Sequence, residues 1–213
     1  MNRLESIVHI IDDDQSFRTA VGRLLSASGF RVAVYESADQ FLAQLPDCEH
    51  GCVLLDLDLP GLSGLELQKR LAEKAPLLPI VFLTGQGNVR ASVQAMKAGA
   101  EDFLEKPTPR EALLEAVERA LRRCETRRLE RDRIHALRAR LAELTPREFE
   151  VFGLIVRGRL NKQIAHALGT SERTVKAHRH NVMEKLGARS LAETVSIAER
   201  LGLVDPATDT LSR

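Results

Sequence analysis

Short apolar runs and amphipathic stretches alternate five times between residues 6 and 120. A short apolar run bounded by polar residues predicts a buried strand, and apolar positions three or four apart predict a helix. Strands are predicted at Ile7–Ile11, Phe30–Tyr35, Cys52–Leu55, Ile80–Leu83 and Asp102–Leu104. Helices are predicted near Phe17–Ala27, Ala38–Leu45, Leu65–Lys74, Val89–Ala98 and Arg110–Leu121. Because parallel strands need crossover connections, this alternation predicts a parallel sheet with helices on both faces.

An Arg-rich stretch without Gly or Pro follows Leu121 and runs to Leu144. It predicts a helix that continues the last helix of the first region. Within it, Ile134, Leu137, Leu141 and Leu144 recur at spacings of three and four, which makes a short apolar stripe. The stripe could pack on a partner helix or on the chain's own next domain, and the sequence leaves both open.

The last 65 or so residues predict four short helices, which must pack together to be stable. Expected helix starts are Thr145 with Pro146 and Glu148, Asn161, Ser171, and Ser190 with Glu193. Expected helix ends are Gly158, Gly169 and Gly187. The span 161–186 reads as helix, tight turn and helix, the spacing of a helix-turn-helix.

Charge separates the two ends of the chain. Residues 1–118 hold 11 Lys and Arg against 18 Asp and Glu, whereas residues 119–213 hold 20 against 12. This sign pattern is typical of a metal or phosphate switch joined to a module that binds a polyanion. We therefore expect a first domain over 6–120, a helical linker over 121–143 and a second domain over 144–205.

Neither a long apolar window nor a signal-peptide pattern occurs, so we expect a cytoplasmic protein with no membrane partner. Cys48, Cys52 and Cys124 are an odd and scattered set, which argues against a disulfide framework. The stretch Cys48-Glu49-His50-Gly51-Cys52 has metal-binding residue types, but no second cluster completes a tetrahedral set. We therefore expect no zinc site.

Chemically active residues follow the ends of four predicted strands. The first strand runs into Asp12-Asp13-Asp14, the third into Asp56, the fourth into Thr84 and the fifth into Lys106. In an open parallel sheet, the crevice beyond the carboxyl ends of the strands is where ligands bind. Clustered carboxylates there suit Mg²⁺, with Asp12 and Asp13 as the metal-side pair.

A bound divalent ion would let a further carboxylate, Asp56, attack a phosphoryl group and form an aspartyl phosphate. Lys106 would pair with the phosphoryl oxygens, and Thr84 would donate a hydrogen bond to one of them. Taken alone, Asp12 to Asp14 could be a solvated surface turn, and Lys106 could lie in a surface loop. Neither explanation accounts for reactive residues at four strand ends together.

Four separated motifs resemble the response-regulator receiver family over about residues 6–120. They are Val8-His9-Ile10-Ile11-Asp12-Asp13-Asp14, Leu54-Leu55-Asp56-Leu57-Asp58-Leu59-Pro60-Gly61, Phe82-Leu83-Thr84-Gly85 and Phe103-Leu104-Glu105-Lys106-Pro107. The resemblance implies a doubly wound, flavodoxin-like five-stranded fold and phosphoryl transfer from a sensor histidine kinase to Asp56. It also implies that the backbone carbonyl of Asp58 completes the Mg²⁺ shell and that Thr84 and Phe103 form the switch. The acidic side chain of Asp58 departs from the basic residue common in the family, which bears on metal affinity.

In the second helix of the helix-turn-helix, positions of two kinds alternate at helical spacing. Val175, Val182 and Leu186 share one face and are predicted to be core. The opposite face carries Arg173, Lys176, Ala177 and His180, which suit a reader of the DNA major groove.

Residues 140–205 resemble the LuxR/NarL-type DNA-binding domain, and the whole chain resembles FixJ-like response regulators. The resemblance rests on Leu144-Thr145-Pro146-Arg147-Glu148, Asn161-Lys162-Gln163-Ile164-Ala165, Thr174-Val175-Lys176-Ala177-His178-Arg179 and Met183-Glu184-Lys185-Leu186-Gly187. By position it implies base contacts from Lys176, Ala177 and His180, and phosphate contacts from Asn161, Lys162, Arg173 and Arg179. It also implies a homodimer on phosphorylation, promoter DNA with two half-sites, RNA polymerase as a partner, and no enzymatic activity of its own.

The sequence is also compatible with two other classes of protein. Asp56-Leu57-Asp58 also fits the Asp-x-Asp motif of haloacid-dehalogenase-like phosphatases, although that reading leaves Asp12, Asp13 and the helix-turn-helix unexplained. A LuxR-type regulator that senses a small molecule fits poorly, because the first domain has no Trp and only one Tyr, Tyr35.

Overall fold

The computed structural model describes residues 6–45, 50–85 and 89–204. The chain divides into two compact units, residues 1–129 and 130–213. Each unit has its own hydrophobic core, so each is described separately.

The first unit is built on one parallel sheet. Its strands are β1 (Ile7–Ile11), β2 (Arg31–Tyr35), β3 (Gly51–Asp56), β4 (Ile80–Thr84) and β5 (Asp102–Glu105). Their order in the sheet is β2-β1-β3-β4-β5, and every neighbouring pair is parallel. The predicted five-stranded parallel sheet is therefore confirmed, with its strand order reversing at β1.

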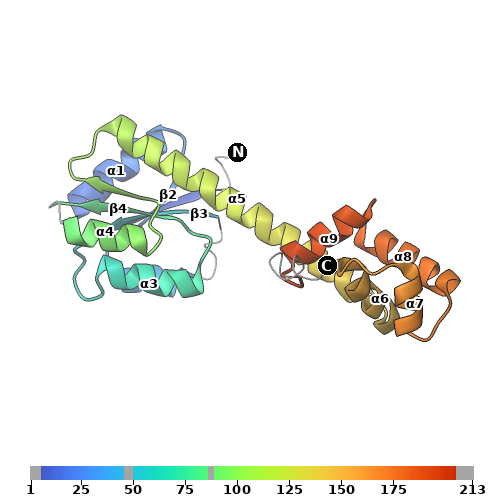
Figure 1. Ribbon diagram of the computed structural model, residues 1–213. Helices are drawn as coiled ribbons and strands as arrows, with labels where there is room; N and C mark the ends of the chain where they lie inside the picture. Colours follow the sequence, from blue (N-terminus) through green and yellow to red (C-terminus); the bar gives the residue numbers. More distant parts are fainter. Residues whose placement is uncertain (1–5, 46–49, 86–88, 205–213) are drawn as a thin grey trace. The chain divides into compact units, whose positions relative to one another are not determined.

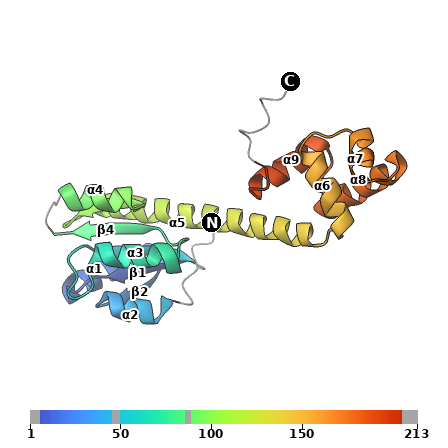
Figure 2. The same cartoon turned by 60° about the horizontal axis from the view of Figure 1, so that its bottom comes forward.

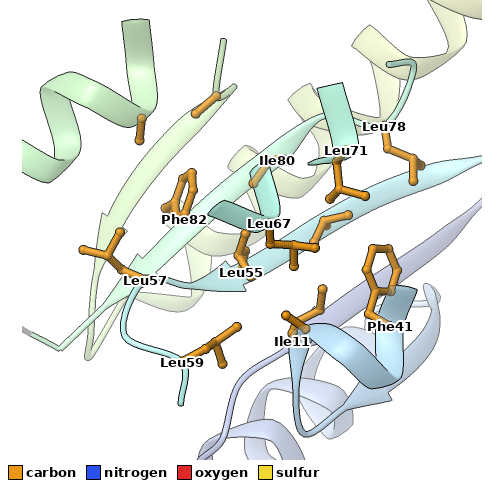
Figure 3. Close-up of a cluster of buried hydrophobic side chains, with 14 of the residues drawn as sticks. Ile11, Phe41, Leu55, Leu57, Leu59, Leu67, Leu71, Leu78, Ile80 and Phe82 are labelled. Carbon is orange, nitrogen blue, oxygen red and sulfur yellow. The ribbon is translucent and has the colours of Figure 1, made fainter. Parts of the chain in front are cut away.

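Helices cover both faces of this sheet, as Figure 1 shows. Their bounds are α1 (Gln15–Ala27), α2 (Ala38–Ala43), α3 (Gly64–Lys74), α4 (Val89–Lys97) and α5 (Arg110–Ala142). One core joins α2, α3 and α4 to the sheet, and the other joins α1 and α5 to the opposite face. Figure 3 shows the first core, in which Phe82, Leu55 and Leu67 lie close together. All six residues of β3 are buried, as expected of a central strand in a doubly wound fold.

Helix α5 is continuous from Arg110 to Ala142. The prediction that the Arg-rich stretch extends the last helix of the first region is confirmed. In the first unit this helix buries Leu113, Val117 and Leu121 against the sheet.

The second unit contains α6 (Pro146–Val156), α7 (Asn161–Ala167), α8 (Glu172–Leu186) and α9 (Leu191–Arg200), which are grouped together in Figure 2. Thr145 and Glu148 form the predicted capping box at the start of α6. Ser171 caps α8, and Gly187 ends it in the left-handed conformation at φ 69°. The predicted four-helix domain is therefore confirmed.

Two predicted caps differ in the structure. Asn161 does not cap α7, since it is the first residue of the helix and the preceding Leu160 occupies the cap position. The Gln163 side chain accepts a hydrogen bond from the Leu160 backbone amide at 2.9 Å and so satisfies one of the free donors at the helix start. At α9, Ser190 accepts from the Glu193 amide as predicted, but the Glu193 carboxylate accepts from the amide of Arg189 rather than that of Ser190.

The apolar stripe at the end of α5 packs within the second unit. Leu137, Leu141 and Leu144 lie against a core that includes Phe152, Val182 and other residues of α6, α8 and α9. Of the two possibilities left open by the sequence, packing on the chain's own next domain is the one observed for these three leucines. Within the described residues, no helix is long and apolar enough to cross a membrane.

Candidate functional site

Three carboxylates meet where the central strands of the sheet end. Asp12 and Asp13 follow β1 directly, and Asp56 is the last residue of β3. One carboxylate oxygen from each lies within 4.8 Å of the others. Asp12 is buried and Asp13 exposed, and the Asp56 side chain keeps 9% of its surface accessible. The three groups thus form an acidic pocket that opens to solvent.

Lys106 supplies the positive charge of this pocket. Its Nζ lies 2.5 Å from Asp12 Oδ2 and 3.1 Å from Asp56 Oδ2. The residue follows β5, where its backbone amide donates to the carbonyl of Thr84 at 2.7 Å. The ammonium also lies 4.3 Å from the centre of the Phe17 ring, which shields the group from solvent and favours a cation.

The pocket holds more negative than positive charge. Burial raises the pKa of Asp12, and the hydrogen bonds from Lys106 and the Asp14 amide only partly oppose that change. Burial alone would lower the pKa of Lys106, but the hydrogen bond to Asp12 and the charge of Asp56 outweigh it and the pKa is raised. Lys106 is therefore a cation at neutral pH, and the pocket favours a further cation.

Asp14 stands apart from the other two acidic residues of the first motif. Its side chain caps α1 and accepts from the amides of Ser16 and Phe17. Its own amide donates to Asp12 Oδ1 at 2.9 Å, which fixes the orientation of that carboxylate.

Thr84, Phe103 and Asp58, the other residues expected at the site, differ in burial. Thr84 ends β4 and is fully buried. Phe103 is half-buried on β5, with its ring centre 6.0 Å from that of Phe82. Asp58 is exposed, and its amide lies 3.5 Å from Asp56 Oδ1, at the limit of a hydrogen bond.

The second unit presents a polar face on α8. Arg173, Lys176, Ala177 and His180 are all exposed, and their spacing of three and four places them on one side of the helix. Val175, Val182 and Leu186 are buried, as predicted. A short turn connects α7 to α8, and the two helices form a helix-turn-helix.

Two of the residues expected to meet phosphates are bonded to each other. Arg179 Nη1 donates to Asn161 Oδ1 at 3.0 Å, which links α8 to the first residue of α7. Lys162 is exposed beside this pair. In the structure the Asn161 side chain positions Arg179 instead of capping its own helix.

The cysteine-containing stretch gives no metal site within the described residues. Cys48 and Glu49 lie outside the described residues, and Cys52 is a buried free thiol on β3. Burial raises the pKa of Cys52 above its ordinary value, so the thiolate that a metal needs is disfavoured.

Each of the two units matches a known protein family. Residues 8–118 match the response regulator receiver domain, and residues 142–198 match the bacterial regulatory proteins of the luxR family. The chain belongs to the FixJ-like response regulators. It therefore regulates transcription in a phosphorylation-dependent way and is not an enzyme of the phosphatase class, since its relatives are transcriptional regulators.

Relatives similar along the whole length support this assignment. The response regulator protein TmoT of Ectopseudomonas mendocina is 40% identical over 94% of this chain and 91% of its own. The transcriptional regulatory protein FixJ of Bradyrhizobium diazoefficiens is 40% identical over 93% of this chain and 97% of its own. A solved structure of the response regulator StyR is 44% identical, covers 92% of this chain and 98% of its own, and superposes with a TM-score of 0.80.

One residue at the acidic pocket of this response regulator was missed by sequence reasoning. Arg18, on the first turns of α1, donates from its guanidinium to the backbone carbonyl of Asp12. Its position four residues after the Asp14 cap is a possible signal, because that spacing returns a side chain to the face of the helix start.

Proposed function

We propose that Asp56 of this response regulator accepts a phosphoryl group from a sensor histidine kinase. The observation that carries the proposal is the meeting of Asp12, Asp13, Asp56 and Lys106 at one edge of the sheet. Asp56 is the carboxylate suited to be the nucleophile, since it combines an accessible surface with an ammonium at 3.1 Å.

The donor set of the pocket fits Mg²⁺. Hard carboxylate oxygens in small number, with an open side for water, are what that ion prefers. Asp12, Asp13 and Asp56 would hold it, together with the backbone carbonyl of Asp58. When bound, the ion supplies positive charge that lets an anionic phosphoryl donor approach a carboxylate.

In the proposed transfer, an Asp56 oxygen attacks phosphorus as the bond from phosphorus to the kinase histidine nitrogen breaks. The nitrogen takes the electron pair of the broken bond, and an aspartyl phosphate forms. Lys106 pairs with the new phosphoryl oxygens, and its position near Asp56 means that little reorganisation is needed. The Thr84 hydroxyl donates to another of these oxygens, and Phe103 follows it inward as the switch.

Phosphorylation is proposed to control dimerisation through α4. Val89, Val93 and Met96 lie on this helix with exposed fractions of 75%, 48% and 46%. An apolar face of this kind on a soluble unit is typical of a surface that a partner covers. A homodimer would place two recognition helices on two half-sites of promoter DNA, so that both contribute to affinity.

For DNA recognition, the exposed face of α8 supports base contacts by Lys176, Ala177 and His180. Phosphate contacts are assigned to Asn161, Lys162, Arg173 and Arg179, with the Asn161 side chain holding the Arg179 guanidinium in place. We propose RNA polymerase as the further partner at the promoter, and the cytoplasm as the place where kinase and DNA are both accessible.

The phosphoacceptor is tested by incubating the protein with acetyl phosphate and Mg²⁺ and measuring its intact mass. Wild type and the control Asp39→Asn, at an exposed position of α2 outside the pocket, should gain one phosphoryl group, and Asp56→Asn should gain none. An Asp56→Asn protein that is phosphorylated as fully as wild type would refute the assignment.

The recognition face is tested by promoter-fragment binding at fixed salt. Lys176→Ala should weaken binding by about tenfold or more, because a lost base contact costs on the order of 1–3 kcal/mol. Arg200→Ala, at an exposed position of α9 away from this face, is the matched control. Equal affinities for the two variants would contradict the assignment.

A further inference from the structure

One stretch of the second unit contains basic residues and no acidic residue. Between Glu150 and Glu172 the sequence holds Arg157, Arg159 and Lys162 but neither Asp nor Glu. All three of these basic side chains are exposed. Only Lys162 belongs to the expected DNA contacts, so the loop between α6 and α7 is a positive surface without an assigned partner.

The backbone of this loop is fixed by hydrogen bonds. Gly158 has a φ of 73°, and its amide donates to the Ile155 carbonyl at 2.9 Å. The Arg159 amide donates to the Leu154 carbonyl at 3.1 Å. These two bonds are those of a Schellman motif, in which a left-handed residue ends the helix. Because the backbone is already ordered, a ligand bound by the loop costs little further backbone freedom.

The side chain of Arg159 is unusual for its place in this motif. The residue that follows the left-handed glycine frequently packs an apolar side chain against the end of the helix. Here that residue is an arginine, and its side chain is exposed. Among the residues that the structure describes, the guanidinium has no ion-pair or hydrogen-bond partner. The arginine therefore adds little to the packing of α6, which indicates a role outside the chain's own core.

Arg159 lies next to residues expected to contact DNA. It precedes Asn161 by two residues, so the Cα atoms of the two are at most about 7 Å apart. The Asn161 side chain accepts a hydrogen bond from Arg179 of α8 at 3.0 Å. Helices α6, α7 and α8 share a buried core and lie together in Figure 1. The loop, α7 and α8 therefore keep a fixed arrangement, and the loop continues the surface expected to face DNA.

DNA phosphate is the ligand that fits this position. In a helix-turn-helix, the second helix reads base edges while the first helix crosses the DNA backbone. Since α7 is the first helix of the pair, a residue just before it is placed to meet phosphate rather than bases. The planar guanidinium can bind a phosphate with two parallel hydrogen bonds.

We propose that Arg159 binds a DNA phosphate beside Asn161 and Lys162, and so adds one sequence-independent contact to each half-site. The inference rests on the proposed DNA recognition by α8 and extends it to a residue outside the helix-turn-helix. A phosphate contact raises the affinity for every sequence alike. It also makes binding more sensitive to salt, because each neutralised phosphate releases counterions.

The test measures binding of the full-length protein to two duplexes of equal length over a range of salt concentrations, at constant acetyl phosphate and Mg²⁺. Wild-type protein selects one duplex from a random-sequence library, and the other is a scrambled form of it. Arg159→Gln should weaken binding to both duplexes by about threefold to tenfold per bound chain at about 0.1 M salt. The slope of log affinity against log salt should fall in magnitude by about one per bound chain. Arg200→Gln, at an exposed position of α9, is the matched control and should bind both duplexes like wild type.

Two further variants separate the possible contacts. Arg159→Lys keeps the charge and should retain the wild-type slope. Wild-type affinity and slope in Arg159→Gln would overturn the proposal, and so would a loss confined to the selected duplex, which would mean a base contact. Lys176→Ala should instead lose affinity mainly for the selected duplex. If it does not, the recognition face of α8 is wrong while the result for Arg159 stands.

Arg159→Leu distinguishes DNA binding from a structural role. Leucine suits the position after the left-handed glycine, so thermal unfolding followed by circular dichroism should occur at or above the wild-type temperature. DNA binding should nevertheless weaken as in Arg159→Gln. Loss of stability together with loss of binding would mean that Arg159 holds the end of α6, and the proposal would be wrong.

Discussion

His9 should make the stability of the first unit depend on pH. The residue lies on β1 with 1% of its surface exposed, beside the rings of Tyr35 and Phe41. Its Nδ1 lies 3.2 Å from the Tyr35 hydroxyl, and its buried Nε2 has no hydrogen-bond partner among the residues that the structure describes. Burial lowers the pKa of His9 from 6.5 to about 4, because a buried imidazolium would lose its hydration.

The sign and size of the effect follow from proton linkage. Between pH 6.5 and about 4 the unfolded chain protonates at His9 while the folded chain does not, so stability falls as pH falls through this window. At about 1.4 kcal/mol per pH unit, the full effect is about 3.5 kcal/mol, of which about 2 kcal/mol is lost between about pH 8 and pH 5. The raised pKa of Asp12 acts with the opposite sign, so a comparison of two variants is required.

Denaturant unfolding of wild type and His9→Leu, at about pH 8 and pH 5 with EDTA, isolates this contribution. The chain has one tyrosine and no tryptophan, so the fluorescence of Tyr35 reports on the first unit alone. His9→Leu should lose about 2 kcal/mol less than wild type on acidification, and the control His50→Leu, at an exposed position, should follow wild type. If wild type and His9→Leu lose the same free energy, the buried neutral imidazole is not the cause.

Two substitutions test packing in the two units. Gly64→Ala should destabilise the first unit by about 1–3 kcal/mol in Tyr35 fluorescence, because a Cβ there would lie 2.4 Å from the Asp56 carbonyl oxygen. Gly153→Ala, in the second unit, where a Cβ meets nothing within 4 Å, should be neutral or stabilising by circular dichroism, and a loss as large as that of Gly64→Ala would refute the steric argument. Lys185→Met removes the ammonium 2.6 Å from Glu148. The hydrogen bond from Lys185 is the largest of several contacts, with those of Thr145 next, that together lower the Glu148 pKa to about 2. Circular dichroism should show a loss of about 1–3 kcal/mol at neutral pH that shrinks as pH falls from 4.5 toward 2, and an unchanged melting curve would contradict it.

The strands and helices could be predicted because their patterns arise from burial. The β3 run is buried at every position, and the adjoining helices are amphipathic, so each element carries its own periodicity. The packing of the end of α5 could not be predicted, because its apolar stripe fits a partner helix and the chain's own next domain equally well. Only the positions of α6, α8 and α9 decide that Leu137 and Leu141 pack within their own unit.

Part of the acidic pocket could also be predicted, since the ends of parallel strands share one edge. That rule places Asp12, Asp13 and Asp56 near one another without any knowledge of side-chain conformation. It does not say which groups pair, and the close approach of Lys106 to Asp12 and the Arg18 contact emerge only in three dimensions. Asn161 shows the same limit: it is the first helical residue and not the cap, and its side-chain oxygen accepts a hydrogen bond from Arg179 of another helix.

The charges of the pocket supply an argument for a divalent cation that is separate from family membership. Asp12, Asp13 and Asp56 face one ammonium from Lys106, while Arg18 is bonded to a backbone carbonyl rather than to a carboxylate. An ionised pocket therefore carries an excess of about two negative charges, which is costly where Asp12 is buried. Esterification of Asp56 would replace one negative charge by a phosphoryl group of about −1.5 to −2. The proposed reaction thus increases the demand for a cation, so by linkage the cation and the phosphoryl group should each favour binding of the other.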